Sequence, residues 1–182
     1  MNKEKLTTRD LCMIGIWAAI IAVMAQIAIP MPMGVPMTMQ TFAVTLSALV
    51  LGSKKGAMAS LIYVLIGAIG IPVYANFTGG IHILFGPTGG FLISFPIMAY
   101  VIGLGAEYVA DNKVIYWLMI TIGTIVNYII GVIIFCIVAG AGIEVALGAC
   151  VVPFIPTAII KALASGILGI KIRPRLVKII WN

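Results

Sequence analysis

The chain has 182 residues, of which 63% are hydrophobic and only 9% carry a formal charge, and its mean hydropathy is +1.22. Soluble globular domains carry about a quarter charged residues. The composition therefore excludes a soluble protein and indicates one that is embedded in a lipid bilayer. The net charge of +6 would also suit a nucleic-acid partner, but the positions of the basic residues give it a different meaning.

Glycine, proline and charged residues interrupt the apolar sequence and divide it into six predicted transmembrane helices. Their ranges are 11–29, 38–51, 56–71, 88–106, 114–139 and 157–172. The stretch 11–53 contains no charged residue and is too long for one crossing of about 20 residues, so the chain must turn back within it. We expect an all-α, polytopic membrane protein in which residues 1–182 form a single six-helix membrane domain.

Three of the predicted helices are shorter than a full crossing; 38–51 spans about 21 Å of a hydrocarbon core that is roughly 30 Å thick. The neighbouring loops 30–37 and 72–87 contain no charge, and we expect 140–156 to be irregular in the same way. Irregular backbone is stable at this depth only where it is buried in protein or lines a cavity. The sequence therefore predicts a cavity bordered by these loops.

Most of the basic residues fall at one end of the predicted helices. Ten of the eleven do so: Lys3, Lys5, Arg9, Lys54, Lys55, Lys113, Lys171, Arg173, Arg175 and Lys178. Because positive residues stay on the cytoplasmic side, this pattern predicts that both termini lie in the cytoplasm. We expect a multi-pass protein of the bacterial plasma membrane, with lipid and not nucleic acid as its surroundings.

The eleventh basic residue, Lys161, lies in the apolar stretch 154–169. A charged side chain inside the bilayer is costly, which makes a functional site the default hypothesis. No carboxylate lies at helical spacing from it, so we expect Lys161 to bind an anion that arrives from outside. The alternative is that its long stem carries the ammonium group to the membrane surface.

Uncharged polar and aromatic residues gather near the same level of the membrane. Together they predict a pocket for a small amphipathic anion, whose apolar ring would pack between aromatic side chains. Asn127 and Tyr128, midway along 114–139, serve equally well as ligand contacts or as contacts between helices. The candidate ligand-binding residues are Lys161, Asn76, Phe77, Tyr74, Thr88, Phe91, Gln40, Asn127 and Tyr128.

The motifs of catalysis are missing. His82 is the only histidine, and the three cysteines are scattered, which matches no metal or redox spacing. The segment 86–90 is rich in glycine but lacks the lysine and hydroxyl residue of a phosphate-binding loop. We expect no enzyme activity, no metal, no cofactor and no ATP site in this chain.

Small residues recur along the first predicted helix at Gly15, Ala18, Ala22 and Ala25. They leave a smooth face where another helix can approach closely. That face could meet a partner protein or pack inside this one, and the sequence does not decide between the two.

The chain resembles the BioY family, the biotin-binding S components of energy-coupling factor (ECF) transporters. The similarity spans nearly the whole chain and rests on four segments: Gln40-Thr41; Gly70-Ile71-Pro72-Val73 leading into Asn76-Phe77-Thr78-Gly79-Gly80; Phe85-Gly86-Pro87-Thr88-Gly89-Gly90-Phe91-Leu92; and Pro156 with Lys161. One departure is Ala158, where many members have an aspartate.

The resemblance implies six helices, a binding site near the outer face, and a separate transmembrane coupling subunit with two ATPase subunits. It also implies that Lys161 pairs with the biotin carboxylate, that Asn76 contacts the ureido ring, and that Ala18 and Ala22 meet the coupling subunit. The alternative function is a solitary secondary carrier or facilitator for biotin or another small organic anion. A third is a membrane scaffold.

Overall fold

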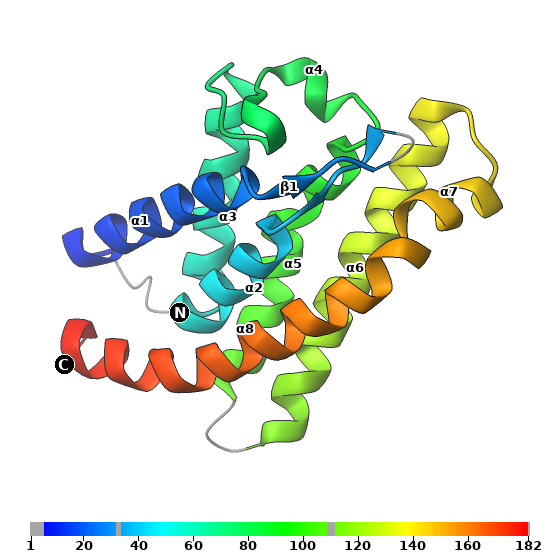
Figure 1. The fold of residues 1–182 in the computed structure, drawn as a ribbon. Coiled ribbons are helices and arrows are strands. Elements are labelled where there is room, and N and C mark those ends of the chain that lie inside the picture. Colours follow the sequence, from blue (N-terminus) through cyan, green and yellow to red (C-terminus); the bar gives the residue numbers. More distant parts are fainter. Residues whose placement is uncertain (1–5, 32–33, 109–111, 182) are drawn as a thin grey trace.

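The computed structural model describes residues 6–31, 34–108 and 112–181. Lys3 and Lys5, two residues of the predicted cytoplasmic charge, lie outside them. The described residues form α1 (Thr8–Ala25), β1 (Ala28–Ile29), β2 (Met37–Thr38), α2 (Gln40–Leu51), α3 (Ser53–Ala68), α4 (Ile81–Leu84), α5 (Gly89–Glu107), α6 (Lys113–Ala139), α7 (Ile143–Cys150) and α8 (Ile155–Leu176), shown in Figure 1. Shorter helical turns cover Ala75–Phe77, Val152–Phe154 and Val177–Trp181.

Each predicted helical segment overlaps with one long helix, namely α1, α2, α3, α5, α6 and α8 in chain order. Several ends differ from the prediction. Helix α1 begins at Thr8 because Thr7 and Asp10 form a reciprocal capping box. It ends at Ala25, not at 29, because the next residues pair with Met37–Thr38 in an antiparallel hairpin.

The prediction that 140–156 is irregular was wrong, because α7 and the turn Val152–Phe154 occupy most of it. The loop 72–87 likewise contains the turn Ala75–Phe77 and the single turn of α4. These elements are too short to show a helical period in the sequence. They connect the ends of the long helices on the side of the molecule where the hairpin lies (Figure 1).

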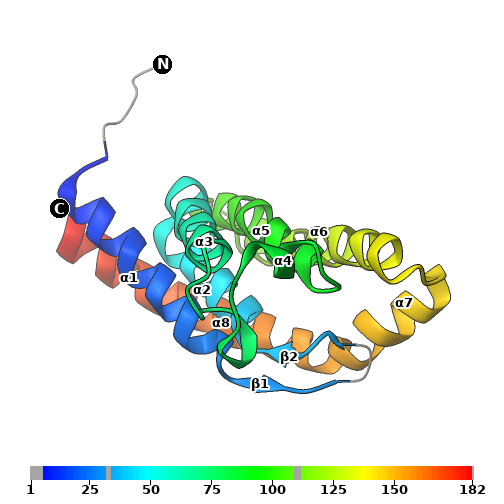
Figure 2. The same ribbon diagram turned by 90° about the horizontal axis from the view of Figure 1, so that it is seen from above.

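Helix α2 lies at the centre of the bundle. In Figure 2, α3, α5 and α6 lie on one side of it, and α1, α8 and the β1–β2 hairpin lie on the other. All residues from Ala43 to Leu51 are buried, as expected for a helix that is surrounded on every face. The position of α2 explains how a helix too short to cross a bilayer is still strongly apolar.

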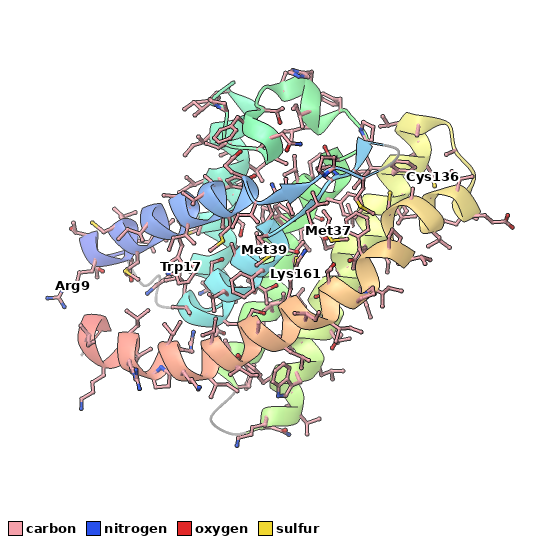
Figure 3. All side chains as sticks on the ribbon, viewed as in Figure 1. Arg9, Trp17, Met37, Met39, Cys136 and Lys161 are labelled. Carbon is pink, nitrogen blue, oxygen red and sulfur yellow. The ribbon has the colours of Figure 1, made fainter. Side chains whose placement is uncertain are left out.

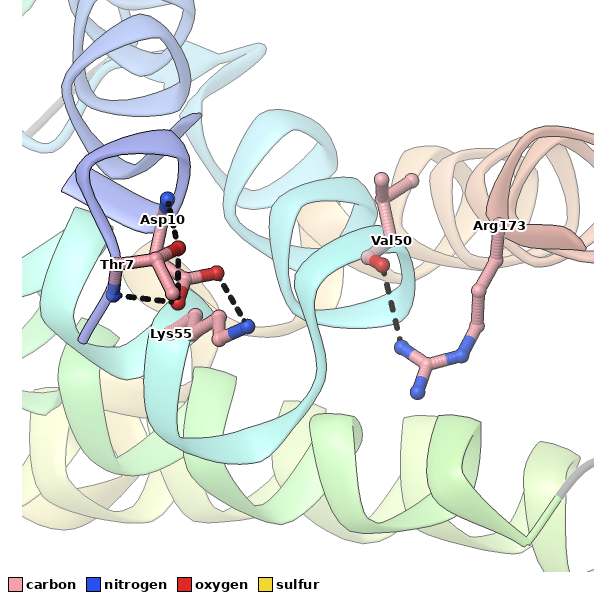
Figure 4. Close-up of polar contacts among 5 residues, drawn as sticks. All are labelled: Thr7, Asp10, Val50, Lys55 and Arg173. Atoms are coloured by element: carbon pink, nitrogen blue, oxygen red, sulfur yellow. Dashed lines mark hydrogen bonds and ion pairs between the residues drawn. The ribbon is translucent and has the colours of Figure 1, made fainter. Parts of the chain in front are cut away.

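Charged side chains join the start of α1 to α3 and the end of α2 to α8 (Figure 4). Lys55 forms an ion pair with Asp10, which connects the start of α3 to the start of α1. The Arg173 guanidinium of α8 donates hydrogen bonds to the carbonyl oxygens of Leu49 and Val50, at 3.3 and 3.1 Å. These carbonyls belong to the last turn of α2, which has no intrahelical donors for them.

A single residue, Gly52, separates α2 from α3. Its φ of +88° is one that side chains rarely adopt. Glu107, the last residue of α5, accepts hydrogen bonds from the backbone N–H and the hydroxyl of Ser53 at 2.8 and 2.7 Å. The start of α3 is thus capped by α5, and the end of α2 by α8.

The outer faces of α6 and α8 are apolar. Exposed side chains on them include Leu118, Ile122, Ile125, Ile129, Ile133 and Ile137 of α6, and Ile159, Ile160, Leu163 and Ile167 of α8. Four stretches are long and apolar enough to cross a membrane on their own: Thr8–Ala25, Gly89–Glu107, Lys113–Ala139 and Ile143–Ile179. Exposed apolar surface of this extent indicates contact with lipid, so the prediction of an all-α membrane protein is confirmed.

We predict that Arg173→Met destabilises the protein by about 1–3 kcal/mol, because it leaves two carbonyl oxygens of α2 without their donor. Unfolding of the detergent-solubilised protein by a denaturing detergent, followed by circular dichroism, measures the change. Arg175→Met is the matched control, since Arg175 lies exposed on the same helix. Equal stability of the two variants would show that the Arg173 contacts contribute nothing.

Candidate functional site

A cavity of about 270 Å³ lies at the hairpin end of the bundle, among α2, α5, α6, α8, the hairpin region and the segment 74–78. Pockets for small ligands begin at roughly 300 Å³, so this cavity suits a compact molecule. Eight of the nine predicted ligand-binding residues line it: Lys161, Asn76, Tyr74, Thr88, Phe91, Gln40, Asn127 and Tyr128. The structure therefore brings together residues that are up to 121 positions apart in the sequence.

Lys161 is the one charged residue among the described residues that line the cavity. Its ammonium group donates a hydrogen bond to the carbonyl oxygen of Thr38 at 2.6 Å. Figure 3 shows Lys161 on α8 beside Met37 and Met39, which flank Thr38. The side chain is therefore held at the cavity wall by a backbone acceptor. A neutral carbonyl leaves the positive charge unbalanced, so the site is suited to an anion.

A polar chain at the start of α2 forms another part of the wall. The Thr38 hydroxyl donates to Gln40 Oε1 at 2.7 Å, and Gln40 Nε2 donates to the Tyr63 hydroxyl. All three side chains are buried. Buried polar groups that are satisfied in this way fix one geometry, and here they fix the position of the Thr38 carbonyl to which Lys161 is bound.

Asn127 presents an amide from the middle of α6. Its Nδ2 donates to the Phe91 carbonyl oxygen at 3.1 Å and to Ser94 Oγ at 2.7 Å. Both donor hydrogens are used, whereas no described residue donates to Oδ1. Asn127 is only 2% exposed, and its free carbonyl oxygen is suited to accept a hydrogen bond from a ligand N–H.

Aromatic side chains form the apolar part of the cavity. Phe91 and Tyr128 pack edge to face, with ring centroids 6.3 Å apart. Gly131 makes this position of Phe91 possible, because a Cβ there would lie 2.3 Å from the ring. Phe95 and Phe154 also line the cavity. This arrangement suits a flat or bicyclic apolar group.

The segment 73–78, which we call the Asn76 loop, closes the cavity on another side. Asn76 and Phe77 both have left-handed backbone conformations, with φ of 57° and 56°. Asparagine tolerates this conformation, whereas a bulky residue such as phenylalanine pays roughly 1–2 kcal/mol. No described residue forms a hydrogen bond with the Asn76 side chain, so its amide is available to a ligand.

Tyr74 anchors the Asn76 loop to α3. Its hydroxyl donates to the Val64 carbonyl oxygen at 2.6 Å, and burial raises its pKa to about 12, so it remains a donor. The ring lies against the bare backbone of Gly67, where a Cβ would come within 2.1 Å of it. Tyr74 thus contributes its ring to the cavity while its hydroxyl is already occupied.

Phe77 is the predicted site residue that the structure does not bring into the cavity. Its side chain is 72% exposed, because the left-handed turn places Asn76 on the cavity side of the loop. The sequence reasoning also missed Phe95, Leu92, Val35, Ile83 and Cys150 as lining residues. All are apolar, and nothing in the sequence distinguishes an apolar residue at a cavity from one in the core.

Ala18 and Ala22, the residues predicted to meet a partner, lie on the side of α1 that faces the rest of the bundle. Ala18 is 4% exposed and packs in the main hydrophobic core, and Ala22 is half-buried against the same core. The exposed small residues of α1 are instead Gly15 and Ala19. The spacing of four is present on both faces of α1, and the sequence alone gave no means of choosing the outer one.

These features define an all-α membrane protein with a partly enclosed cavity whose described lining residues include one cation, Lys161. The chain belongs to the BioY family, whose family model matches residues 1–178. The resemblance predicted from the sequence is therefore confirmed.

Similar proteins span most of this chain. The biotin transporter BioY of Thermotoga maritima is 44% identical over 87% of this chain and 82% of its own length. A probable biotin transporter BioY of Pyrococcus horikoshii is 39% identical over 90% and 96%. The crystal structure of an S-component for biotin from an ECF-type ABC transporter matches with a TM-score of 0.83 and 22% identity, over 93% of this chain and 95% of that one. The BioY family, to which this chain and these transporters belong, is a family of transport components and not of enzymes.

We predict that Lys161→Met loosens the β1–β2 hairpin in the ligand-free protein, because a charge-assisted hydrogen bond to Thr38 is lost. Such a bond contributes about 1.5–3 kcal/mol, so amide hydrogen exchange in 27–31 and 34–39 should become roughly ten- to a hundredfold faster. Lys171→Met, at an exposed position of the same helix, should leave the exchange unchanged. Equal exchange in both variants would mean that Lys161 does not hold the hairpin.

Proposed function

We propose that this protein is the substrate-binding S component of an ECF transporter and that it binds biotin for uptake into the cell. The observation that carries the proposal is the ammonium group of Lys161, which is the single charge among the described residues that line a cavity of amides, hydroxyls, aromatic rings and aliphatic groups. Biotin has one carboxylate, a ureido group with two N–H donors and a carbonyl acceptor, and an apolar bicyclic body. Membership of the BioY family supports biotin over other small anions.

In this proposal Lys161 pairs with the biotin carboxylate and exchanges its bond to Thr38 for a stronger, charged one. The free Oδ1 of Asn127 accepts from one ureido N–H, and the unpaired amide of Asn76 contacts the other side of the same group. Phe91, Tyr128 and the ring of Tyr74 pack on the bicyclic body. Phe77 is not part of the site.

The arrangement of charge supports six membrane crossings with both termini in the cytoplasm. The ion pair between Lys55 and Asp10 and the contact of Arg173 with Val50 place the basic ends of α1, α3 and α8 on one side. The cavity lies at the other end of α2, which begins at Gln40. By the positive-inside rule the basic end faces the cytoplasm, and the cavity then faces outward, where biotin is collected.

The exposed face of α1 is the surface we propose for the transmembrane coupling subunit, through which two ATPase subunits would act. It contains Gly15 and Ala19, with Cys12, Ile16 and Val23 around them, and a Cβ at Gly15 would have no protein atom within 4 Å. Small residues allow another helix to approach closely. Ala18 is replaced in this role by Ala19.

We predict that Lys161→Met weakens biotin binding by about ten- to a hundredfold, because the carboxylate loses its charged partner. Titration calorimetry on the purified protein measures this change, with Lys171→Met as the control. Biotin methyl ester should bind the unaltered protein as weakly as biotin binds the variant. Unchanged affinity of Lys161→Met would remove Lys161 from the site.

We predict that Ala19→Trp abolishes biotin uptake by cells while the purified protein still binds biotin normally, since the large ring blocks helix approach without reaching the cavity. Ile137→Trp, on the exposed face of α6, is the control and should leave uptake intact. Normal uptake by Ala19→Trp would exclude this face. Uptake by cells that lack every coupling subunit would favour a solitary carrier.

A further inference from the structure

Gln26 connects the end of α1 to the Asn76 loop. Its Nε2 lies within hydrogen-bond distance of the carbonyl oxygens of Val73 and Tyr74, at 3.3 and 3.1 Å, and its Oε1 accepts from the Phe77 N–H at 2.8 Å. The same Nε2 is 3.0 Å from the carbonyl oxygen of Ala22 on α1. One amide group thus contacts both sides of the turn that presents Asn76.

These contacts stabilise a conformation that is unfavourable by itself. Phe77 has a left-handed backbone that a bulky residue rarely adopts, and its N–H points to Gln26. Because Asn76 precedes it and has the same left-handed conformation, releasing the Phe77 N–H would allow both residues to relax. Asn76 would then leave the cavity wall.

The end of α1 also contacts the opposite wall of the cavity. The Ile27 carbonyl oxygen accepts from the Met39 N–H at 3.0 Å, and Met39 follows Thr38, which binds Lys161. Residues 26 and 27 are therefore connected to both the Asn76 loop and the hairpin. A displacement of this end of α1 would therefore move both the Asn76 loop and the hairpin, which form two walls of the cavity.

We infer that Gln26 is a positioning residue for the ligand: it acts through the Asn76 loop and makes the position of Asn76 depend on the end of α1. It does not line the cavity and needs no contact with the ligand. That the ligand is biotin, and that α1 docks on a coupling subunit, rest on the function proposed above. If both proposals hold, docking of the coupling subunit on α1 would change the affinity of the site for biotin through Gln26.

The first experiment uses the ligand-free protein and needs no assumption about the ligand. Gln26→Met keeps the length of the side chain and removes its amide. Hydrogen exchange in 73–80 should become about tenfold faster, while exchange in the buried helix α2 stays the same. Gln26→Glu keeps an acceptor for the Phe77 N–H but places a second oxygen against the carbonyl oxygens of Val73 and Tyr74, so it should not restore the protection.

The second experiment measures biotin binding in a double-mutant cycle. Gln26→Met should weaken biotin binding about tenfold in the unaltered protein, mainly through faster dissociation, and less than about twofold when Asn76→Ala is already present. Thr121→Val is the control, because the Thr121 hydroxyl is exposed and bonds only to its own helix. Its affinity and exchange should match the unaltered protein.

The two experiments separate the possible failures. Unchanged exchange in 73–80, or equal losses of affinity with and without Asn76, would overturn the inference about Gln26. If Gln26→Met weakened binding while Asn76→Ala had no effect, Gln26 would not act through Asn76, and the inference would again fail. If the unaltered protein bound no biotin, the proposed function would fail, while faster exchange in Gln26→Met would still support the positioning of the loop.

Discussion

The structure depends on keeping one ammonium group inside a lipid-embedded bundle. A cation at this depth is costly unless it is hydrogen-bonded or paired, and Lys161 receives a single carbonyl oxygen, that of Thr38. That carbonyl is fixed in turn by buried polar side chains at the start of α2. This hydrogen bond holds the Lys161 ammonium group in place, but a neutral carbonyl does not balance its positive charge. An incoming carboxylate therefore gains more from Lys161 than the resident carbonyl does.

The two ends of the bundle have different chemistry. At the basic end, side chains of Asp10, Lys55, Glu107 and Arg173 join five helices through bonds to charged groups. At the cavity end, the one bond to a charged group among the described residues is that of Lys161 to Thr38, and the other connections, such as that between Gln26 and the Asn76 loop, are neutral. Neutral bonds to short loops are weaker than bonds to charged groups. The bundle is thus held more firmly at the basic end than at the cavity end.

The sequence predicted the positions of the long helices well, because apolar runs and their interruptions by glycine, proline and charge are local signals. It also predicted eight of the nine proposed site residues to be where the cavity is, since an isolated lysine and a few amides are conspicuous in an apolar chain. It failed where the outcome depends on tertiary contacts. Only the packed structure shows that Ala18 faces inward, that Phe77 turns away from Asn76, and that α7 forms after α6.

The one-residue junction at Gly52 has a consequence for how the binding end is aligned. Only Gly52 separates α2 from α3, so no loop is present there to accommodate an extra residue. Each inserted residue would therefore rotate one of the two helices by about 100° and shift it by about 1.5 Å. Gln40 lies at the opposite end of α2, so its orientation depends on the Gly52 junction one helix length away. We therefore expect insertions and deletions among related sequences in the connections around the cavity and none at the Gly52 junction.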